Sequence, residues 1–167
     1  MRFIDEAIIT VRSGKGGNGC VAFRREKYVE FGGPNGGNGG KGGDIYIKGD
    51  RNIHSLQDVR LQRVYEAENG KPGQGSQCDG RGGKDCIIHV PLGTMVFDCT
   101  HDTELFLHDI TDTEQMFLLA QGGRGGKGNE HFKTSTLRTP RFAQKGELGE
   151  EKKIRLELKI LADVGIV

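Results

Sequence analysis

The stretch Gly33-Pro34-Asn35-Gly36-Gly37-Asn38-Gly39-Gly40-Lys41-Gly42-Gly43-Asp44 places glycine at every third position. One set of glycines lies at 33, 36, 39 and 42, and a second set lies at 37, 40 and 43. A flexible linker needs glycine but has no use for a period. A period of three matches the polyproline II helix, which has three residues per turn and no internal hydrogen bonds. This stretch therefore predicts regular, extended backbone.

The same spacing recurs along the chain, which contains 28 glycines. A helix with glycine at every third position has one edge of bare backbone, so neighbouring helices can approach closely and exchange N–H and C=O hydrogen bonds. We therefore predict a packed bundle of short polyproline II helices, in runs far too short for collagen. The alternative is a set of disordered glycine-rich loops between strands. The glycines to which we assign this structural role are Gly33, Gly36, Gly39, Gly42, Gly122, Gly125 and Gly128.

Apolar residues gather in short segments between the glycine-rich ones. Near the end of the chain, Ile154, Leu156, Leu158 and Ile160 alternate with charged residues, which is the period of a strand with one buried face. No segment has a sustained helical period, so the predicted fold is mainly β, with a sheet or small barrel interrupted by glycine-rich excursions over 13–43, 69–84 and 121–149. We predict strands over 6–12, 20–23, 44–48, 59–65, 86–90, 94–98, 104–110, 115–121 and 153–160, and a helical turn over 52–58 with Asn52 as its N-cap.

The composition limits the class of protein. A chain of 167 residues is one domain, and with 34% hydrophobic residues its apolar core must be small. The four cysteines show no C-x-x-C spacing, the charged N-terminus is unlike a signal peptide, and no apolar run approaches the ~20 residues of a membrane span. These features predict reduced thiols, a cytoplasmic location and no transmembrane segment.

Charge is distributed unevenly although the net charge is only +1. Residues 97–115 contain six acids and no Lys or Arg, whereas 131–145 contain four bases and no acid. This polarity is typical of a basic face that meets an anionic partner. Two ordinary solvated faces are the alternative, and charge alone does not choose between them.

Motifs for catalysis or small ligands are weak. Residues 14–19 fit G-x-G-x-x-G, but that fingerprint needs a helix after its last glycine, and residues 20–23 look extended. No P-loop pattern is present, the five histidines have no partner at ligand spacing, and no catalytic constellation stands out. We predict no catalytic residue, no metal site and no nucleotide site in this chain.

Basic residues near the ends of the glycine runs are the remaining candidates. If the helices lie side by side, the connections between them gather at one end of the bundle. Aromatic residues lie among these bases, and Arg or Lys on phosphates with aromatics on unstacked bases is the chemistry of RNA binding. The predicted RNA-binding residues are Arg24, Arg25, Lys27, Arg81, Lys84, Lys133, Arg138 and Arg141.

Residues 16–28 and 32–40, together with Val90-Pro91-Leu92-Gly93-Thr94 and Arg138-Thr139-Pro140-Arg141, resemble the N-terminal domain of the Obg (CgtA) GTPases. The resemblance covers nearly all of residues 1–160 and implies the Obg fold, a glycine-rich bundle of polyproline II helices on a small β-barrel. It implies that 1–158 form this domain. Residues 159–167 then resemble the linker and the first strand of the GTP-binding domain, whose P-loop comes next in the family and is not reached here.

The resemblance also implies a function. The intact protein would hydrolyse GTP with Mg²⁺ and act in large ribosomal subunit assembly, while these 167 residues alone would neither bind nor hydrolyse GTP. The domain would dock on large-subunit ribosomal RNA through its basic loop tips, with other stress or assembly proteins as further partners and without DNA. The alternative is a protein-interaction scaffold without direct RNA contact, in which the acidic residues 97–115 meet basic partners.

Overall fold

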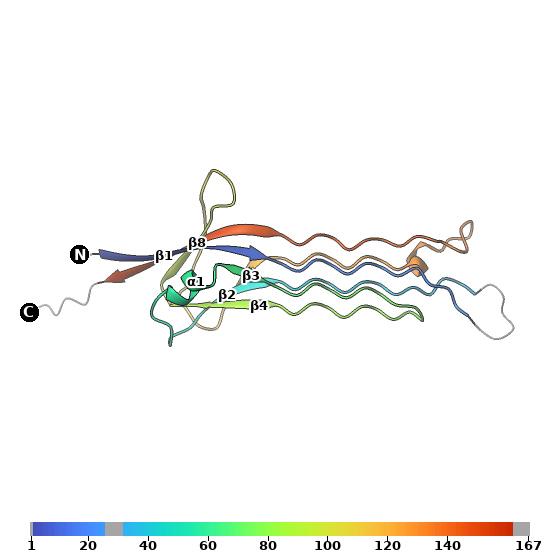
Figure 1. The fold of residues 1–167 in the computed structure, drawn as a ribbon, viewed down its shortest axis with the longest axis horizontal. Helices are drawn as coiled ribbons and strands as arrows, with labels where there is room; N and C mark the ends of the chain where they lie inside the picture. The colour runs from blue at the N-terminus through green and yellow to red at the C-terminus, as the bar shows by residue number, and fades with distance from the viewer. Residues whose placement is uncertain (1, 26–31, 162–167) are drawn as a thin grey trace, which may run out of the picture.

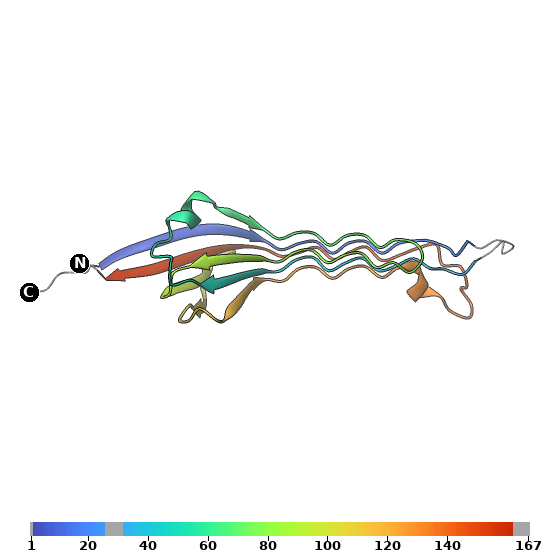
Figure 2. The ribbon, with the colours of Figure 1, turned by 90° about the horizontal axis from the view of Figure 1, so that it is seen from below.

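The computed structural model describes residues 2–25 and 32–161. Strands form one end of an elongated molecule, and long glycine-rich segments run side by side from them to the opposite end (Figures 1 and 2). We call these the sheet end and the bundle. The elements are β1 Arg2–Arg12, β2 Ile45–Gly49, α1 Gln57–Leu61, β3 Val64–Glu66, β4 Cys86–Val90, β5 Thr94–Asp98, β6 Leu105–Asp109, β7 Met116–Ala120, η1 Asn129–Phe132 and β8 Glu151–Leu161.

The strands form two sheets, one in the order β3-β1-β8-β5-β6 and one in the order β4-β2-β7. Strands β1 and β8 pair antiparallel over their whole length, from Arg2 with Leu161 to Arg12 with Glu151. The short strand β3 adds parallel to β1, and β4 adds parallel to β2. The mainly β class is thus confirmed, and the expected barrel takes the form of two small sheets.

Both sheets supply side chains to a single core. Ile9 of β1, Val96 of β5 and Leu156 of β8 are buried on one side, against Ile47 of β2 and Leu119 of β7 on the other. The alternation expected near the end of the chain is present in β8, where every second residue from 154 to 158 is buried. The apolar core is therefore confined to the sheet end, as the low hydrophobic content predicts.

Three predicted elements differ from the observed ones. Cys20–Phe23 is no strand, because its only ladder contact in the described chain is an isolated bridge between Phe23 and Pro34. The helical turn lies later than expected, at Gln57–Leu61, and the buried carboxylate of Asp5 accepts a hydrogen bond from the N–H of Leu56 at its start. The predicted strand over 59–65 is reduced to β3, because the helix occupies its first residues.

Six extended segments form the bundle, and they hydrogen-bond to one another with a period of three. Gly14 N–H donates to Gly43 O at 2.8 Å, and Gly17 N–H donates to Gly40 O at 2.8 Å. The polyproline II interpretation accounts for this pattern, since such a helix leaves every N–H for a neighbour. We define the six segments by the first and last residues that make such bonds: 13–20, 33–43, 68–74, 78–84, 122–129 and 144–150.

Glycine leaves no room for a side chain where the segments touch. A Cβ added at Gly39 would lie 1.8 Å from Gly17 O, and one at Gly125 would lie 1.8 Å from Gly39 O. An added Cβ would likewise lie within 2.0 Å of a backbone oxygen at Gly36, Gly42, Gly122 and Gly128. Gly33 differs, since among the described residues a Cβ there would approach only Lys133 Nζ, at 3.7 Å. The close packing predicted for the whole set therefore does not include Gly33.

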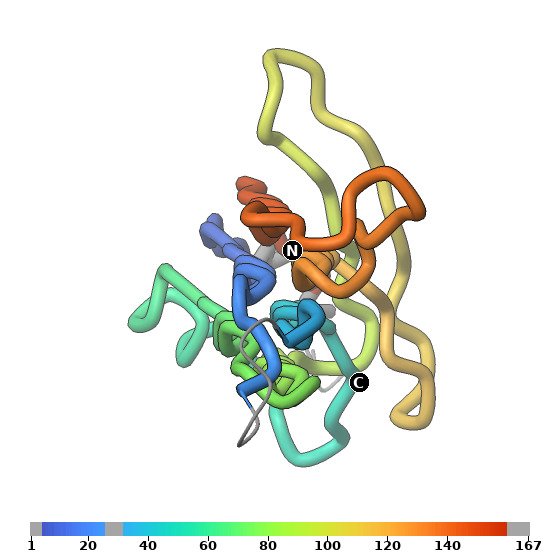
Figure 3. The backbone as a smooth tube through the Cα atoms, turned by 90° about the vertical axis from the view of Figure 1, so that its right-hand side faces the viewer, coloured from blue at the N-terminus to red at the C-terminus, as the bar shows by residue number. Residues whose placement is uncertain are grey.

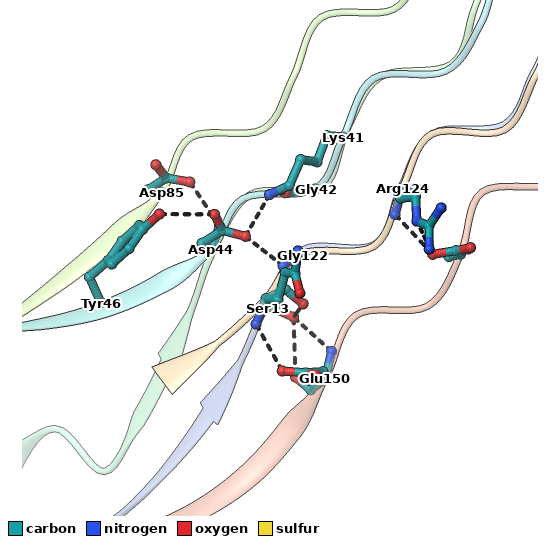
Figure 4. Close-up of polar contacts among 11 residues, drawn as sticks. Ser13, Lys41, Gly42, Asp44, Tyr46, Asp85, Gly122, Arg124 and Glu150 are labelled. Carbon is teal, nitrogen blue, oxygen red and sulfur yellow. Dashed lines mark hydrogen bonds and ion pairs between the residues drawn. The ribbon is translucent and has the colours of Figure 1, made fainter. Parts of the chain in front are cut away.

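Polar side chains bind the backbone where the sheets pass into the bundle (Figure 4). We call Ser13, Asp44, Asp85 and Glu150 the collar. Asp44 accepts hydrogen bonds from Lys41 Nζ at 2.5 Å, Gly122 N–H at 2.7 Å and Tyr46 Oη at 3.1 Å. Ser13 Oγ accepts a hydrogen bond from Glu150 N–H at 2.7 Å and donates one to Gln121 O at 2.7 Å. These bonds join four bundle segments, 13–20, 33–43, 122–129 and 144–150, where strand pairing ends.

We expect Asp44→Ala to lower the free energy of unfolding by about 1–3 kcal/mol at pH 7, because Gly122 N–H loses its acceptor in a partly buried site. Burial raises the pKa of Asp44, but the bonds from Lys41, Gly122 and Tyr46 outweigh burial and lower it overall. The stabilisation is therefore full above the unfolded pKa of about 4 and is lost as the pH falls below it. Urea unfolding at pH 7 and pH 3 measures both effects.

The matched control is Asp102→Ala, which removes an exposed carboxylate from a turn at the sheet end. We expect it to change the free energy of unfolding by less than about 0.5 kcal/mol. Equal losses in the two variants, or a loss in Asp44→Ala that grows at acidic pH, would contradict the role assigned to Asp44.

Candidate nucleic-acid interface

The turns between bundle segments meet at the end of the molecule opposite the sheets, which we call the distal end and define as residues 20–25, 32–36, 74–78 and 129–143. Figure 3 looks at this end along the bundle and shows the segments gathered behind it. The defined ranges contain five Arg or Lys residues and one carboxylate, that of Glu130. The bundle therefore ends in a predominantly cationic surface.

Asn129 is the buried residue that ties the distal segments together. Its Oδ1 accepts from Gly36 N–H at 2.8 Å, and its Nδ2 donates to Ala22 O at 3.0 Å and to Pro140 O at 3.1 Å. A fully buried amide with all these partners holds three chain segments in a fixed relation. The hydrogen bonds of Asn129 therefore fix the segments that carry the basic residues.

Three of the predicted RNA-binding residues surround one hollow at the distal end. Arg24, Arg25 and Lys133 line it, and the wall is completed by Gly33, Pro34, Asn35, Ser76, Gln77 and Glu130. The hollow has a volume of about 520 Å³. Backbone bonds fix its base, since Arg24 N–H donates to Gly33 O at 2.8 Å and Gln77 N–H donates to Asn35 O at 2.7 Å. The geometry brings these three cations to one place.

Arg138 and Arg141 lie on the loop that follows η1. Thr134 N–H donates to Leu137 O at 2.9 Å, and Leu137 N–H donates to Thr134 Oγ1 at 2.9 Å, so the loop is folded on itself. Both arginines are exposed. Beside them Phe132 and Phe142 pack with ring centroids 4.9 Å apart, and Phe142 keeps 51% of its surface exposed. An exposed ring among arginines offers a surface on which an unpaired base can stack.

Arg81 and Lys84 are not at the distal end, contrary to the expectation that they flank a tip. Their segment turns at 74–78, where Gln74 N–H donates to Cys78 O at 2.8 Å. Arg81 O accepts from Lys71 N–H halfway along the bundle, and Lys84 O accepts from Glu68 N–H next to the collar. Both side chains are exposed on the side of the bundle. The eighth predicted residue, Lys27, lies outside the described residues.

The acidic stretch 97–115 lies at the sheet end, on the end of β5, on β6 and on the connections before and after β6. The basic residues of 131–145 lie at the distal end or on the segment that returns from it (Figure 1). The two charge clusters of the sequence thus occupy opposite ends of the molecule rather than two faces of one globule. An anionic partner is attracted to the distal end and repelled from the other.

The glycine fingerprint over 14–19 has no room for a nucleotide. A Cβ at Gly14 would lie 2.0 Å from Glu68 O, and one at Gly16 would lie 1.9 Å from Arg124 O, so this segment is packed against its neighbours. No helix opens after Gly19 in the described chain, where Cys20 N–H donates to Gly37 O. Among the described residues no helix is long and apolar enough to cross a membrane.

Sequence reasoning missed the polar residues Asn35, Gln77 and Asn129. Asn35 lies inside the glycine repeat, where the sequence does not distinguish it from the other residues between glycines. Gln77 lies in a turn that contains no basic residue, so charge does not indicate it. The residues around Asn129 in the sequence give no indication of its structural role. Its role depends on contacts with residues 93 and 107 positions earlier in the chain, which no local pattern contains.

A glycine-rich bundle on small β sheets is the architecture that the sequence resemblance implies, and comparison with known families agrees. A family model described as GTP1/OBG matches residues 4–160, so the chain belongs to the GTP1/OBG family.

Three relatives carry the name GTPase Obg, and the whole chain aligns with each. The protein of Nitratidesulfovibrio vulgaris (strain DP4) is 60% identical over 168 residues, which cover 46% of its length. Those of Lawsonia intracellularis and Persephonella marina are 61% and 54% identical over 167 residues, covering 46% and 48% of their lengths. The chain thus spans about half the length of these curated relatives.

Proposed function

We propose that this domain docks on large-subunit ribosomal RNA through its distal end. The observation that carries the proposal is the gathering of Arg24, Arg25, Lys133, Arg138 and Arg141 at one end of a hydrogen-bonded bundle. A bundle held by periodic backbone bonds keeps these cations in fixed relative positions, so fewer side chains have to be ordered on binding. The exposed ring of Phe142 adds a stacking surface for an unpaired base.

The elongated shape supports the same role. A distal end far from the sheets reaches into a confined site that a globular domain of equal mass cannot enter (Figure 2). The acidic sheet end stays away from RNA by repulsion, which sets the direction of approach. Arg81 and Lys84, on the side of the bundle, would meet RNA only where it surrounds the inserted bundle.

The intact protein, in this proposal, is a GTPase that acts in large ribosomal subunit assembly in the cytoplasm. The relatives are named GTPase Obg, and this chain corresponds to about half of each. GTP and Mg²⁺ belong to the other half, and these 167 residues would not hydrolyse GTP alone. The domain then serves as the anchor through which the GTPase is held on its RNA target.

The test of docking is the salt dependence of binding. We expect the 167-residue chain to sediment with purified large ribosomal subunits, with an affinity that falls as monovalent salt rises at constant Mg²⁺. If all five described bases neutralise a phosphate of unpaired RNA, the slope of log K against log salt is about −3.5. Saturable binding with a slope near zero would reject an attachment based on phosphates.

The alternative, a protein scaffold that uses the sheet end, rests on one specific observation. On the edge strand β6, Leu105 and Phe106 are 62% and 50% exposed beside the acidic residues of 97–115. A partner bound there would stay bound after nuclease treatment and would be released when the acids are neutralised. RNA docking predicts the opposite result for both treatments.

A further inference from the structure

We infer that the distal hollow is a pocket for one unpaired nucleotide of the RNA, with its phosphate on the cations and its base edge on the amide of Asn35. This inference rests on the proposed RNA docking and assigns a specific interaction within it. The hollow is lined by residues 24–25, 33–35 and 76–77, by Glu130 of η1 and by the C-cap Lys133, which belong to three different turns. Its volume, about 520 Å³, lies in the range of sites that hold small ligands.

The charge of the wall selects an anion. Arg24, Arg25 and Lys133 contribute three cations, and Lys133 Nζ reaches the edge of Gly33. Among the described lining residues the one carboxylate is that of Glu130, and its Oε1 accepts a hydrogen bond from Gln77 Nε2 at 2.6 Å. Three cations against one carboxylate leave the described lining of the hollow with a net positive charge. A phosphate diester that enters is attracted to the two arginines and the lysine.

Asn35 supplies the recognition of a base. Its backbone is fixed, since its N–H donates to Ala22 O at 2.9 Å and its carbonyl accepts from Gln77 N–H. Its side-chain Oδ1 is buried and makes no hydrogen bond within the described chain. A buried acceptor without a partner is costly in a folded protein and points to a function. The amide can turn toward the hollow without losing a hydrogen bond at Oδ1.

An amide that turns in this way matches the edge of a nucleobase. Side-chain amides offer one acceptor and two donors side by side, and they pair with bases through two hydrogen bonds. Inorganic phosphate lacks the adjacent donor and acceptor of a base edge and is held mainly by the cations. The unpaired amide oxygen therefore favours a nucleotide over a bare anion as the occupant.

The turn that contains Ser76 and Gln77 forms one part of the wall of the hollow. Ser76 and Gln77 both have φ of 60°, the left-handed region that side chains rarely adopt. This conformation brings the Gln77 side chain to Glu130 and places both residues in the wall. Positive φ at two consecutive residues, closed by the bond from Cys78 N–H to Gly75 O at 3.3 Å, forms the tight turn that places these side chains.

The experiment compares Asn35→Ala with Asn52→Ala, which removes an exposed amide at the sheet end. The probes are a single-stranded RNA hexanucleotide, large ribosomal subunits and inorganic phosphate. We expect Asn35→Ala to weaken binding of the hexanucleotide and of the subunits about 5- to 10-fold without changing the salt slope, as expected for the loss of a neutral hydrogen bond. Asn52→Ala should change neither affinity, and the melting temperature of both variants verifies the fold.

Nuclear magnetic resonance adds a direct readout. The hexanucleotide should shift the side-chain amide signal of Asn35, and phosphate should shift the neighbours of Arg24 and Arg25 but leave that amide in place. An equal shift with phosphate would show an anion site only and would overturn the inference. Unchanged affinity of Asn35→Ala, with the salt slope retained, would overturn it as well while leaving RNA docking intact. Absence of RNA binding at every salt concentration would reject both proposals.

Discussion

Gly39→Ala should lower the free energy of unfolding by more than about 3 kcal/mol, the upper end of the range for overpacked sites. The added Cβ would lie 1.8 Å from Gly17 O and 2.2 Å from the carbonyl carbon of the same residue. Both are backbone atoms, so no rotamer change relieves the clash, and the two central segments have to move apart. The loss corresponds to a melting temperature about 6–12 °C lower for a chain of this size.

The matched control is Gly82→Ala, a substitution of the same kind in the same bundle. A Cβ at Gly82 would lie 3.6 Å from Lys41 O, which is ordinary van der Waals contact. Alanine lowers the entropy of the unfolded chain, so this variant should be as stable as the natural chain or more stable by about 0.4–1 kcal/mol. Gly83→Ala, one residue further, would place its Cβ 1.9 Å from Glu68 O and should behave like Gly39→Ala.

Thermal unfolding followed by circular dichroism measures all three variants. The decisive comparison is between neighbours, because Gly82 and Gly83 share their segment and their unfolded state. If both substitutions cost the same, the glycines would act through chain flexibility and the close-packed bundle would be wrong. A further variant, Gly33→Ala, should be tolerated because the position is open.

The period of the glycines is predictable from the sequence because it reflects a local constraint. Each close approach between segments recurs every third residue, so Gly36, Gly39 and Gly42 all meet the same neighbouring segment. The alternation of β8 is equally visible, since each buried side chain faces one core. Patterns that repeat along the chain can be recognised in the sequence without knowledge of the segment that each residue contacts.

Features that depend on a single distant partner are not predictable in this way. The helix begins later than the Asn52 cap signal indicates, because the carboxylate of Asp5 binds Leu56 N–H and pairs with Arg60. Arg81 and Lys84 lie away from the distal end because the chain reverses before them, at Ser76 and Gln77, with left-handed backbone and no glycine at those positions. The hollow around Asn35 combines three turns, and no single stretch of sequence contains it.

Reversal of four distal charges should strongly weaken docking. We expect the combined variant Arg24→Glu, Arg25→Glu, Arg138→Glu and Arg141→Glu to bind large ribosomal subunits at least about 100-fold more weakly, equivalent to about 2.8 kcal/mol. Each change removes an attraction to phosphate and adds a repulsion, and the salt slope should fall by about 0.7 for every phosphate that is no longer neutralised. The four side chains are exposed, so the fold should be retained.

The control for this variant has the same change in net charge at other places. Lys15, Arg51, Lys71 and Lys153 are changed together to Glu; they lie on the side of the bundle or at the sheet end. If the distal positions matter, this control retains most of the affinity, whereas equal losses would show attraction by total charge alone.

A third variant, Arg81→Glu with Lys84→Glu, reports RNA binding along the side of the bundle. Because those two residues lie away from the distal end, their reversal should weaken binding less than that of Arg24 and Arg25, and a larger effect would place the RNA along the bundle instead.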